Sequence, residues 1–354
     1  MYRHLLCLSI FTATLIISLS SPLQIAATPL GIEAAQAQTN QERNKEGLRL
    51  NQLGLQQLNK GEFPEALKTF EQVLVIFRAI GNRQGEGAAL NNIGIVYWNL
   101  GQYPKALENY QQALAIHKQT SNRAGEGQTL NNIGLIYKSL GQYSKALEQY
   151  QQAFAIHQEI GNKVGEGTAL NNIGGVYNSL GRYPKALEYY QQALAIHQEI
   201  GNKALESTAL NNIGEVYSNL GQYPKALENY QQALAIAKQI GDKQKESTTL
   251  NNIGEIYSNL GQYPKALENF QQSLAIAKQI GDKQGEGVTL NNIGVVYGNL
   301  GQYPKALEYH QQALRLSIIL GWFTILLVNI LRLKQFFLQQ LRLGRLYEGS
   351  DSNC

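Results

Sequence analysis

A forty-residue period runs through most of the 354-residue chain. Glycine recurs at this spacing in two series, both without a slip in register. The first series is Gly54, Gly94, Gly134, Gly174, Gly214, Gly254 and Gly294, and the second is Gly61, Gly101, Gly141, Gly181, Gly221, Gly261 and Gly301. A fixed period of this length is typical of solenoids and propellers, in which each repeat packs only against its neighbours. The period therefore outweighs chain length, which alone favours two or three compact domains.

Each unit contains two helical patterns joined by a short turn. In the second unit, Leu90, Ile93 and Tyr97 lie at i, i+3 and i+7, which is one face of a helix. The sequence LGQY at 100–103 interrupts this pattern, and Pro104 favours the first turn of a second helix. The sequence thus predicts an all-α fold.

Glycine also marks where helices end and where they meet. The second helix is expected to end at a Gly-Asn or Gly-Asp pair, because glycine tolerates the left-handed conformation that follows a helix. These pairs are 81–82, 161–162, 201–202, 241–242 and 281–282. Gly94, by contrast, lies inside a predicted helix at a cost of about 1 kcal/mol relative to alanine. We expect a neighbouring helix to approach closely there.

The spacing within a unit resembles the tetratricopeptide repeat (TPR) signature. The matching residues are Leu90, Ile93, Gly94, Tyr97, Gly101, Tyr103, Ala106, Tyr110 and Ala113. Leu90 replaces the usual Trp and the terminal Pro is absent, as in the forty-residue variety of kinesin light chains and bacterial multirepeat proteins. The resemblance implies a right-handed α-solenoid of seven tandem helix-turn-helix repeats over residues 50–314. It also implies a concave groove that binds a protein or peptide partner.

Charge and cysteine content exclude other classes of protein. The formal net charge is +4, and acidic and basic residues are balanced within the repeats, so no basic stripe for nucleic acid is expected. The two cysteines, Cys7 and Cys354, lie at the two ends of the chain, so neither a disulfide framework nor a cysteine metal site is expected in the repeats.

Recurring histidines and glutamates do not form a catalytic pattern. His117, His157 and His197 lie a full repeat apart and lack a second ligand at i+3 or i+4, so we interpret them as surface or packing residues rather than a metal site. Glutamates near the start of the first helix complement the helix dipole. They are Glu86, Glu126, Glu166, Glu206, Glu246 and Glu286. The sequence shows no nucleophile paired with a base and an orienting acid, and it shows no phosphate-binding loop. It therefore predicts a non-enzyme without metal or cofactor.

Paired asparagines inside the first helices are the candidate binding residues, because asparagine is a poor helix former. The pairs are Asn91 and Asn92, Asn131 and Asn132, Asn171 and Asn172, Asn211 and Asn212, Asn251 and Asn252, and Asn291 and Asn292. The resemblance implies that such amides line the groove and bind a peptide backbone. The alternative is that they hydrogen-bond between neighbouring repeats. We give the two interpretations equal weight at any one position.

Two other groove positions vary while the packing positions barely change. One series is Ile95, Leu135, Gly175, Glu215, Glu255 and Val295, and the other is Trp98, Lys138, Asn178, Ser218, Ser258 and Gly298. In chain order the groove changes from apolar to acidic. We hypothesise an extended partner segment whose apolar anchor contacts Trp98 and whose basic part contacts Glu215 and Glu255. Drift after recent duplication of the repeats is the alternative.

The ends of the chain differ from the repeats. The apolar run at 5–19 and small residues at 35–37 indicate a signal peptide over residues 1–37, or an uncleaved anchor, followed by a linker at 38–49. The signal peptide predicts an exported protein, periplasmic or extracellular. The apolar and basic tail at 315–354 is interpreted as a cap, a membrane segment or out-of-frame sequence.

The function expected from the sequence is a protein-interaction scaffold that binds extended segments of a partner. The alternative is a regulatory arm that has lost a C-terminal caspase-like peptidase domain, because bacterial proteins with similar repeats often continue into one. A membrane-tethered assembly factor is a third interpretation, and it depends on membrane contact through the tail.

Overall fold

The computed structural model describes residues 29–319, which form fourteen α-helices and no strand. The first helices of the repeats are α1 (Pro29–Asn59), α3 (Arg83–Asn99), α5 (Arg123–Ser139), α7 (Lys163–Ser179), α9 (Lys203–Asn219), α11 (Lys243–Asn259) and α13 (Lys283–Asn299). The second helices are α2 (Phe63–Ala79), α4 (Tyr103–Gln119), α6 (Tyr143–Glu159), α8 (Tyr183–Glu199), α10 (Tyr223–Ile240), α12 (Tyr263–Ile280) and α14 (Tyr303–Ile319). The prediction of an all-α solenoid is confirmed.

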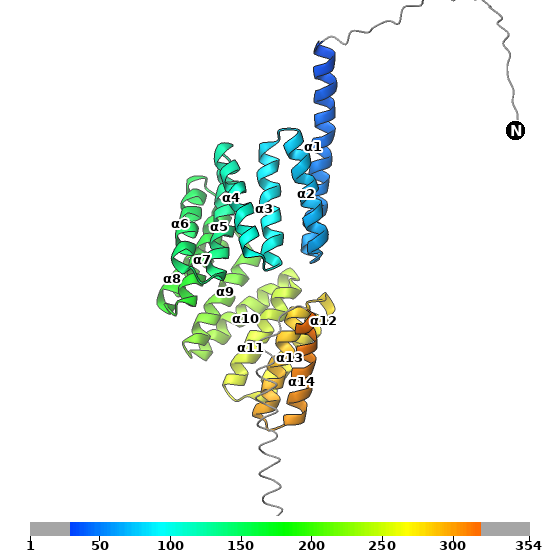
Figure 1. Ribbon diagram of the computed structural model, residues 1–354. Coiled ribbons are helices and arrows are strands. Elements are labelled where there is room, and N and C mark those ends of the chain that lie inside the picture. The colour runs from blue at the N-terminus through cyan, green and yellow to red at the C-terminus, as the bar shows by residue number, and fades with distance from the viewer. Residues whose placement is uncertain (1–28, 320–354) are drawn as a thin grey trace, which may run out of the picture.

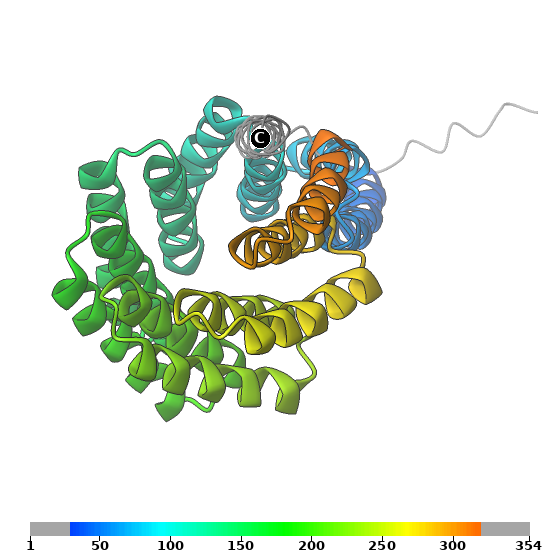
Figure 2. The same cartoon turned by 90° about the horizontal axis from the view of Figure 1, so that it is seen from below.

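The helix pairs stack in chain order and wind around a central axis (Figure 1). Each second helix packs against the first helix of its own repeat and that of the next repeat. From α3 onward, each first helix also contacts the first helix of the following repeat, so the first helices crowd toward the inner side. In the view along the axis, the last repeat returns to the side from which the chain started (Figure 2). The first helices therefore form the concave face.

The boundaries of the repeats differ from the sequence prediction at the N-terminal side. Residues 38–49, expected as a linker, lie within α1 and are helical. Each later first helix starts seven residues before the leucine at which the sequence pattern begins a unit, as Arg83 starts α3 before Leu90. Most of the predicted signal peptide and nearly all of the 315–354 tail lie outside the described residues. Among the described helices, none is long and apolar enough to cross a bilayer.

The outer face of α1 is partly polar where the same face of later first helices is apolar, although Leu53 remains exposed on it. Arg49 is exposed and forms an ion pair with Glu46, whereas Ala89 at the equivalent place in α3 is fully buried. Gln56 is exposed where Val96 of α3 is fully buried. Within residues 29–319 no helix precedes α1, and Arg49 and Gln56 are exposed to water there.

Turns between repeats follow the predicted chemistry. Gly81 has φ = 71°, the left-handed conformation expected after a helix end. Asn82, the second residue of the same pair, accepts a hydrogen bond from Gly85 N at 2.9 Å and so caps α3. One residue pair thus ends one helix and starts the next, and this explains why the connection keeps a constant length.

A glycine against an aromatic ring closes every repeat. A Cβ built on Gly134 would lie 2.6 Å from Cε1 of Tyr150, a side chain with no exposed surface. Equivalent glycine and ring pairs occur in all seven repeats. They are Gly54 with Phe70, Gly94 with Tyr110, Gly134 with Tyr150, Gly174 with Tyr190, Gly214 with Tyr230, Gly254 with Phe270 and Gly294 with His310. The close helix approach expected at Gly94 is confirmed, and its partner is the second helix of the same repeat.

We predict that Gly134→Ala destabilises the solenoid by about 1–3 kcal/mol, because the added methyl group overpacks against the Tyr150 ring. The matched control is Gly287→Ala, where the nearest atom to the new Cβ is 3.8 Å away. The control should be neutral or more stable by up to about 1 kcal/mol through helix propensity. Urea unfolding followed by circular dichroism measures both. Equal midpoints for the two variants would contradict the packing role of Gly134.

Candidate binding groove

A ladder of asparagine amides runs along the concave face. In repeats two, three, five, six and seven, the second asparagine donates through Nδ2 to Oδ1 of the first asparagine, or of Asn51, in the preceding repeat. The bonds are Asn92 to Asn51 (3.0 Å), Asn132 to Asn91 (3.0 Å), Asn212 to Asn171 (2.9 Å), Asn252 to Asn211 (3.0 Å) and Asn292 to Asn251 (3.2 Å). The interpretation in which the amides bond between repeats therefore accounts for both members of three of the six pairs and for one member of each of the other three.

One bond of this ladder is missing, between Asn172 and Asn131. Oδ1 of Asn131 is buried and has no hydrogen-bond partner. Asn91 also accepts a hydrogen bond from Thr129 of the following repeat. One repeat later, Ala169 occupies the position that corresponds to Thr129, and it has no hydroxyl that could donate to Asn131. The amide ladder is thus interrupted between α5 and α7.

The two variable series of the groove pair with one another at a spacing of 37 residues. Asn178 Nδ2 donates to Glu215 Oε1 in the next repeat at 2.9 Å. Lys138 extends over Gly175 in the same way, and a Cβ on this glycine would lie 2.8 Å from Nζ. This pairing was not predicted from the sequence, although the constant spacing between the two series is visible there.

The predicted apolar end of the groove lies in repeats two and three. Ile95, Trp98 and Leu135 are half-buried, and Ile95 and Trp98 pack against the cluster around Tyr110. Nε1 of Trp98 is buried without a hydrogen-bond partner. This end offers apolar surface together with one unpaired N–H donor.

The predicted acidic end lies in repeats five and six, where Glu215 and Glu255 are exposed. Desolvation within the concave face raises the pKa of Glu255, and the negative charge of Glu215 adds to this rise. Glu215 accepts a hydrogen bond from Asn178, whereas no described residue donates to Glu255. Of these two groove carboxylates, Glu255 is therefore the one without a hydrogen-bond donor among the described residues.

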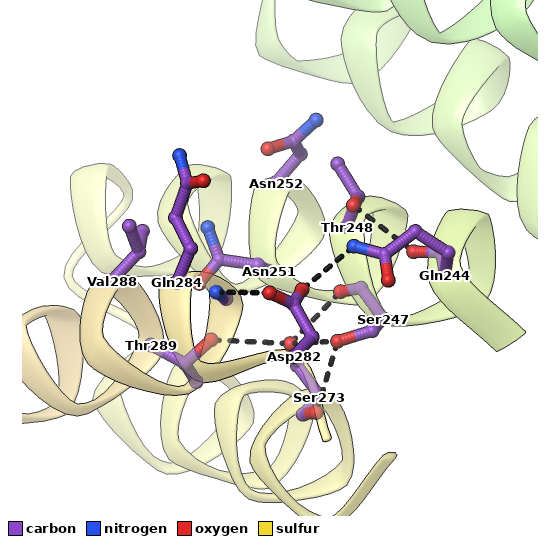
Figure 3. Close-up of a pocket in the computed structure, with 11 residues that line it drawn as sticks. Gln244, Ser247, Thr248, Asn251, Asn252, Ser273, Asp282, Gln284, Val288 and Thr289 are labelled. Carbon is purple, nitrogen blue, oxygen red and sulfur yellow. Dashed lines mark hydrogen bonds between the residues drawn. The ribbon is translucent and has the colours of Figure 1, made fainter. Parts of the chain in front are cut away.

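Pockets open between consecutive first helices at the same place in different repeats. A pocket of about 350 Å³ lies between α11 and α13, and Figure 3 shows the hydroxyls of Ser247, Ser273 and Thr289 linked at its base. Gln244 donates to Asp282 at 2.6 Å across its rim. A pocket of about 400 Å³ lies three repeats earlier, between α5 and α7, and Asn131 lines it. The polar groups at the base of the later pocket bond to one another, whereas the earlier pocket contains an unpaired acceptor.

The recurring histidines are packing residues. His117 and His157 are 3% exposed, and each ring lies against two glycines, one from its own repeat and one from the next. The amide of Asn122 lies 3.3 Å from His117 Nδ1 and that of Asn162 lies 3.3 Å from His157 Nδ1. No group of three or more potential metal-ligating side chains exists in the described part of the chain.

The recurring glutamates are partners of basic residues. Glu86 accepts from Arg78 and Arg83, and Glu166 accepts from Lys163 at 3.1 Å. All six lie in the first turn of a first helix, as expected from the helix dipole. Their oxygens serve ion pairs and the helix start, which leaves no arrangement for acid–base chemistry at these positions.

We predict that the protein becomes less stable as the pH falls below about 6.5, the ordinary pKa of histidine. Burial lowers the pKa of His117 and His157, with the charges of Glu126 and Glu166 opposing this, so the unfolded chain binds more protons. The stabilisation by neutral histidine is complete above the unfolded pKa and is lost as the pH falls through the folded value. The variant H117F/H157F should show a shallower fall of the thermal midpoint between pH 7.5 and pH 5.5.

Phenylalanine is the matched replacement, because Phe77 already lies between two glycines at the equivalent place in repeat one. Both proteins contain the same carboxylates, so the difference between their pH profiles reports on the two histidines and on their interactions with Glu126 and Glu166. Identical profiles would show that these rings do not control acid stability.

A second prediction compares two asparagines of the ladder. Asn211→Leu removes an acceptor and leaves the half-buried Asn252 amide without its partner, so it should cost about 0.5–1.5 kcal/mol. Asn131→Leu removes an acceptor that is already unpaired, and it should be close to neutral. Urea midpoints of the two variants measure the difference. A cost at position 131 as large as that at 211 would contradict the interrupted ladder.

Comparison with known proteins identifies the repeat. The sequence model of the tetratricopeptide repeat matches residues 48–119, 86–159, 165–239 and 245–318. No curated protein matches the chain. Among solved structures, aspartyl phosphate phosphatase F from Bacillus subtilis has a TM-score of 0.64 at 19% identity, over 83% of this chain and 76% of that chain.

Two further structures share the fold. A Rap protein complexed with Competence and Sporulation Factor has a TM-score of 0.54 at 15% identity, over 84% of this chain and 99% of that chain. A signal transduction ATPase with a tetratricopeptide repeat sensor, from Pyrococcus horikoshii, has a TM-score of 0.55 at 19% identity, over 78% of this chain and 46% of that chain. At these identities the likeness concerns the fold alone. Because the family model covers most of the described repeats, the chain belongs to the tetratricopeptide repeat family.

Proposed function

We propose that the protein is a non-catalytic interaction scaffold whose concave face binds an extended segment of a partner protein. The observation that carries the proposal is the contrast between packing and groove positions. The glycine and ring pairs recur in every repeat, whereas the concave side chains change from Trp98 and Leu135 to Glu215 and Glu255. Neither the helix contacts nor the turns require this change of chemistry.

The structure refines the hypothesis that both carboxylates bind the basic part of the segment. Asn178 already donates to Glu215, so the cation of the partner is expected at Glu255, whose carboxylate has no hydrogen-bond donor among the described residues. Lys138 lies between the apolar and acidic ends. The groove then offers an apolar anchor, a cation and a carboxylate in chain order.

The fold of the relatives agrees with this proposal. The Rap protein, which has the same fold, is complexed with Competence and Sporulation Factor. In the Pyrococcus protein the tetratricopeptide repeats are a sensor, and this chain covers 46% of that protein. A sensor role favours one second candidate, a regulatory arm that acts on an effector domain such as the caspase-like peptidase considered above.

Export to the periplasm or the outside of the cell remains part of the proposal, because it depends on the apolar run at 5–19. Membrane contact likewise depends on the tail at 315–354. Nearly all of both segments lies outside the described residues. Fractionation of cells that produce the full chain tests both points.

Site-specific crosslinking tests the scaffold function. A photoreactive residue at Trp98 or Asn172 faces the groove, and one at the exposed Glu228 of α10 is the control. The proposal expects a discrete crosslinked product from the two groove positions and none from the control. The same products from all three positions, or none from the groove, would count against it.

We predict that Glu255→Gln weakens binding of a segment that carries lysine or arginine by up to about fivefold and reduces its salt dependence, because exposed ion pairs contribute up to about 1 kcal/mol. The control is Glu268→Gln on α12, an equal change of charge on an exposed side chain of a second helix. Fluorescence anisotropy with the crosslinked segment, at several salt concentrations, measures both. Equal salt dependence in the two variants would refute the role of Glu255.

A further inference from the structure

The unpaired acceptor on Asn131 is exceptional within the concave face. Asn131 is 9% exposed, it lines the pocket between α5 and α7, and its Oδ1 has no hydrogen-bond partner. In the neighbouring repeats the equivalent oxygens of Asn91 and Asn171 each accept from the next asparagine. A buried carbonyl without a donor is destabilising, so a ligand that supplies an N–H would be stabilised at this position.

The ammonium of Lys138 is the second unusual group of this region. It extends over Gly175, and a Cβ there would lie 2.8 Å from Nζ and 3.5 Å from the hydroxyl of Tyr190. Burial lowers the pKa of Lys138, and the nearby negative charge of Glu215 only partly offsets this. No carboxylate of the described residues forms an ion pair with Lys138. A half-buried lysine that forms no direct ion pair is suited to bind a carboxylate.

Asn131, Leu135 and Lys138 lie on one face of α5, at i, i+4 and i+7. Seven residues of a helix rise by about 10 Å. An extended peptide covers that distance with about three residues. The acceptor, the apolar side chain and the cation therefore match a short stretch of extended chain.

We propose that Asn131, Leu135 and Lys138 form a subsite that binds an acidic side chain, Asp or Glu, of the partner segment at Lys138. An N–H about three residues away in the same segment donates to Asn131. This inference rests on the proposed function and specifies what the groove selects. It adds an acidic residue to the apolar anchor and the basic residue already expected in the segment.

The acidic group is a side chain within the segment rather than a chain terminus. The apolar contact at Trp98 lies in the repeat before Lys138, and the carboxylate of Glu255 lies three repeats after it. A segment that reaches both must continue on either side of the subsite. Gly175 supports this placement, because its lack of a side chain leaves space for the end of Lys138.

A peptide library tests the subsite with the full chain. The probes are acetylated and amidated ten-residue peptides of random sequence in which the fifth residue is fixed as Asp in one pool and as Asn in the other. We expect the immobilised protein to retain the Asp pool about 10- to 100-fold better, as a charge-assisted hydrogen bond requires. Blocked termini remove the terminal carboxylate as a source of the signal.

Two variants locate the preference. Lys138→Gln should reduce the Asp-to-Asn ratio to about one, whereas Lys238→Gln, an equal change of charge on an exposed lysine of α10, should leave the ratio unchanged. Gly175→Ala keeps all charges and adds a better helix former, but it displaces the end of Lys138. Gly175→Ala should therefore also lower the Asp-to-Asn ratio, and it tests the position of the lysine while the lysine itself is kept.

The Asn131 part has its own readout. In the best retained peptide, N-methylation of one amide about three residues from Asp should weaken binding to the natural chain and have little effect on binding to Asn131→Leu.

The outcomes separate this inference from the proposed function. Peptides retained without preference for Asp, or a preference that survives in Lys138→Gln, would overturn the subsite and leave the scaffold function standing. A chain that retains neither pool would overturn both.

Discussion

The contact between a helix glycine and an aromatic ring is the constraint on which the rest of the structure depends. Tyr150 is fully buried because Gly134 carries no side chain, and the same contact sets the separation of the two helices in each repeat. That separation fixes the approach of successive first helices. Side chains spaced 41 residues apart can then bond across it, as Asn132 does to Asn91. A methyl group on the glycine would alter the ladder as well as the core.

The asparagine ladder shows how a binding surface and a structural element use the same residues. Each bond satisfies one amide hydrogen and one carbonyl oxygen on a face that would otherwise contain poor helix formers without compensation. Where the ladder is complete, these atoms are less available to a partner. Where it is interrupted, at Asn131, the concave face presents an unpaired acceptor about two helical turns from Lys138, which forms no ion pair with a described carboxylate. Atoms available to a partner are therefore expected at the interruption, between repeats three and four, rather than along the complete part of the ladder.

The sequence predicted the fold well because its signals are local and repeated. The positions of Gly94, Pro104 and the Gly-Asn pairs determine helix starts, ends and close contacts, and the structure confirms them. Residues 38–49, which the sequence pattern assigned to a linker, are helical, because α1 continues the helix of the first repeat with a partly polar outer face that weakens the periodic pattern. The roles of Asn131 and Lys138 were not predictable from one repeat. They depend on which residue stands 37 or 41 positions later in the neighbouring repeat.

The pairing at 37 residues also bears on whether the groove positions drifted at random. Independent drift would place unrelated side chains opposite one another, and a lysine opposite a bulky residue would clash. Instead Lys138 lies over a glycine, and Asn178 lies against a carboxylate that accepts its amide hydrogen. Each combination is compatible in size or in hydrogen bonding. Selection for stable packing can produce such pairs, but it does not require a half-buried lysine that forms no ion pair or a tryptophan with a buried, unpaired N–H. These unsatisfied groups are destabilising in the free protein, and a bound segment that supplies their partners would remove that cost.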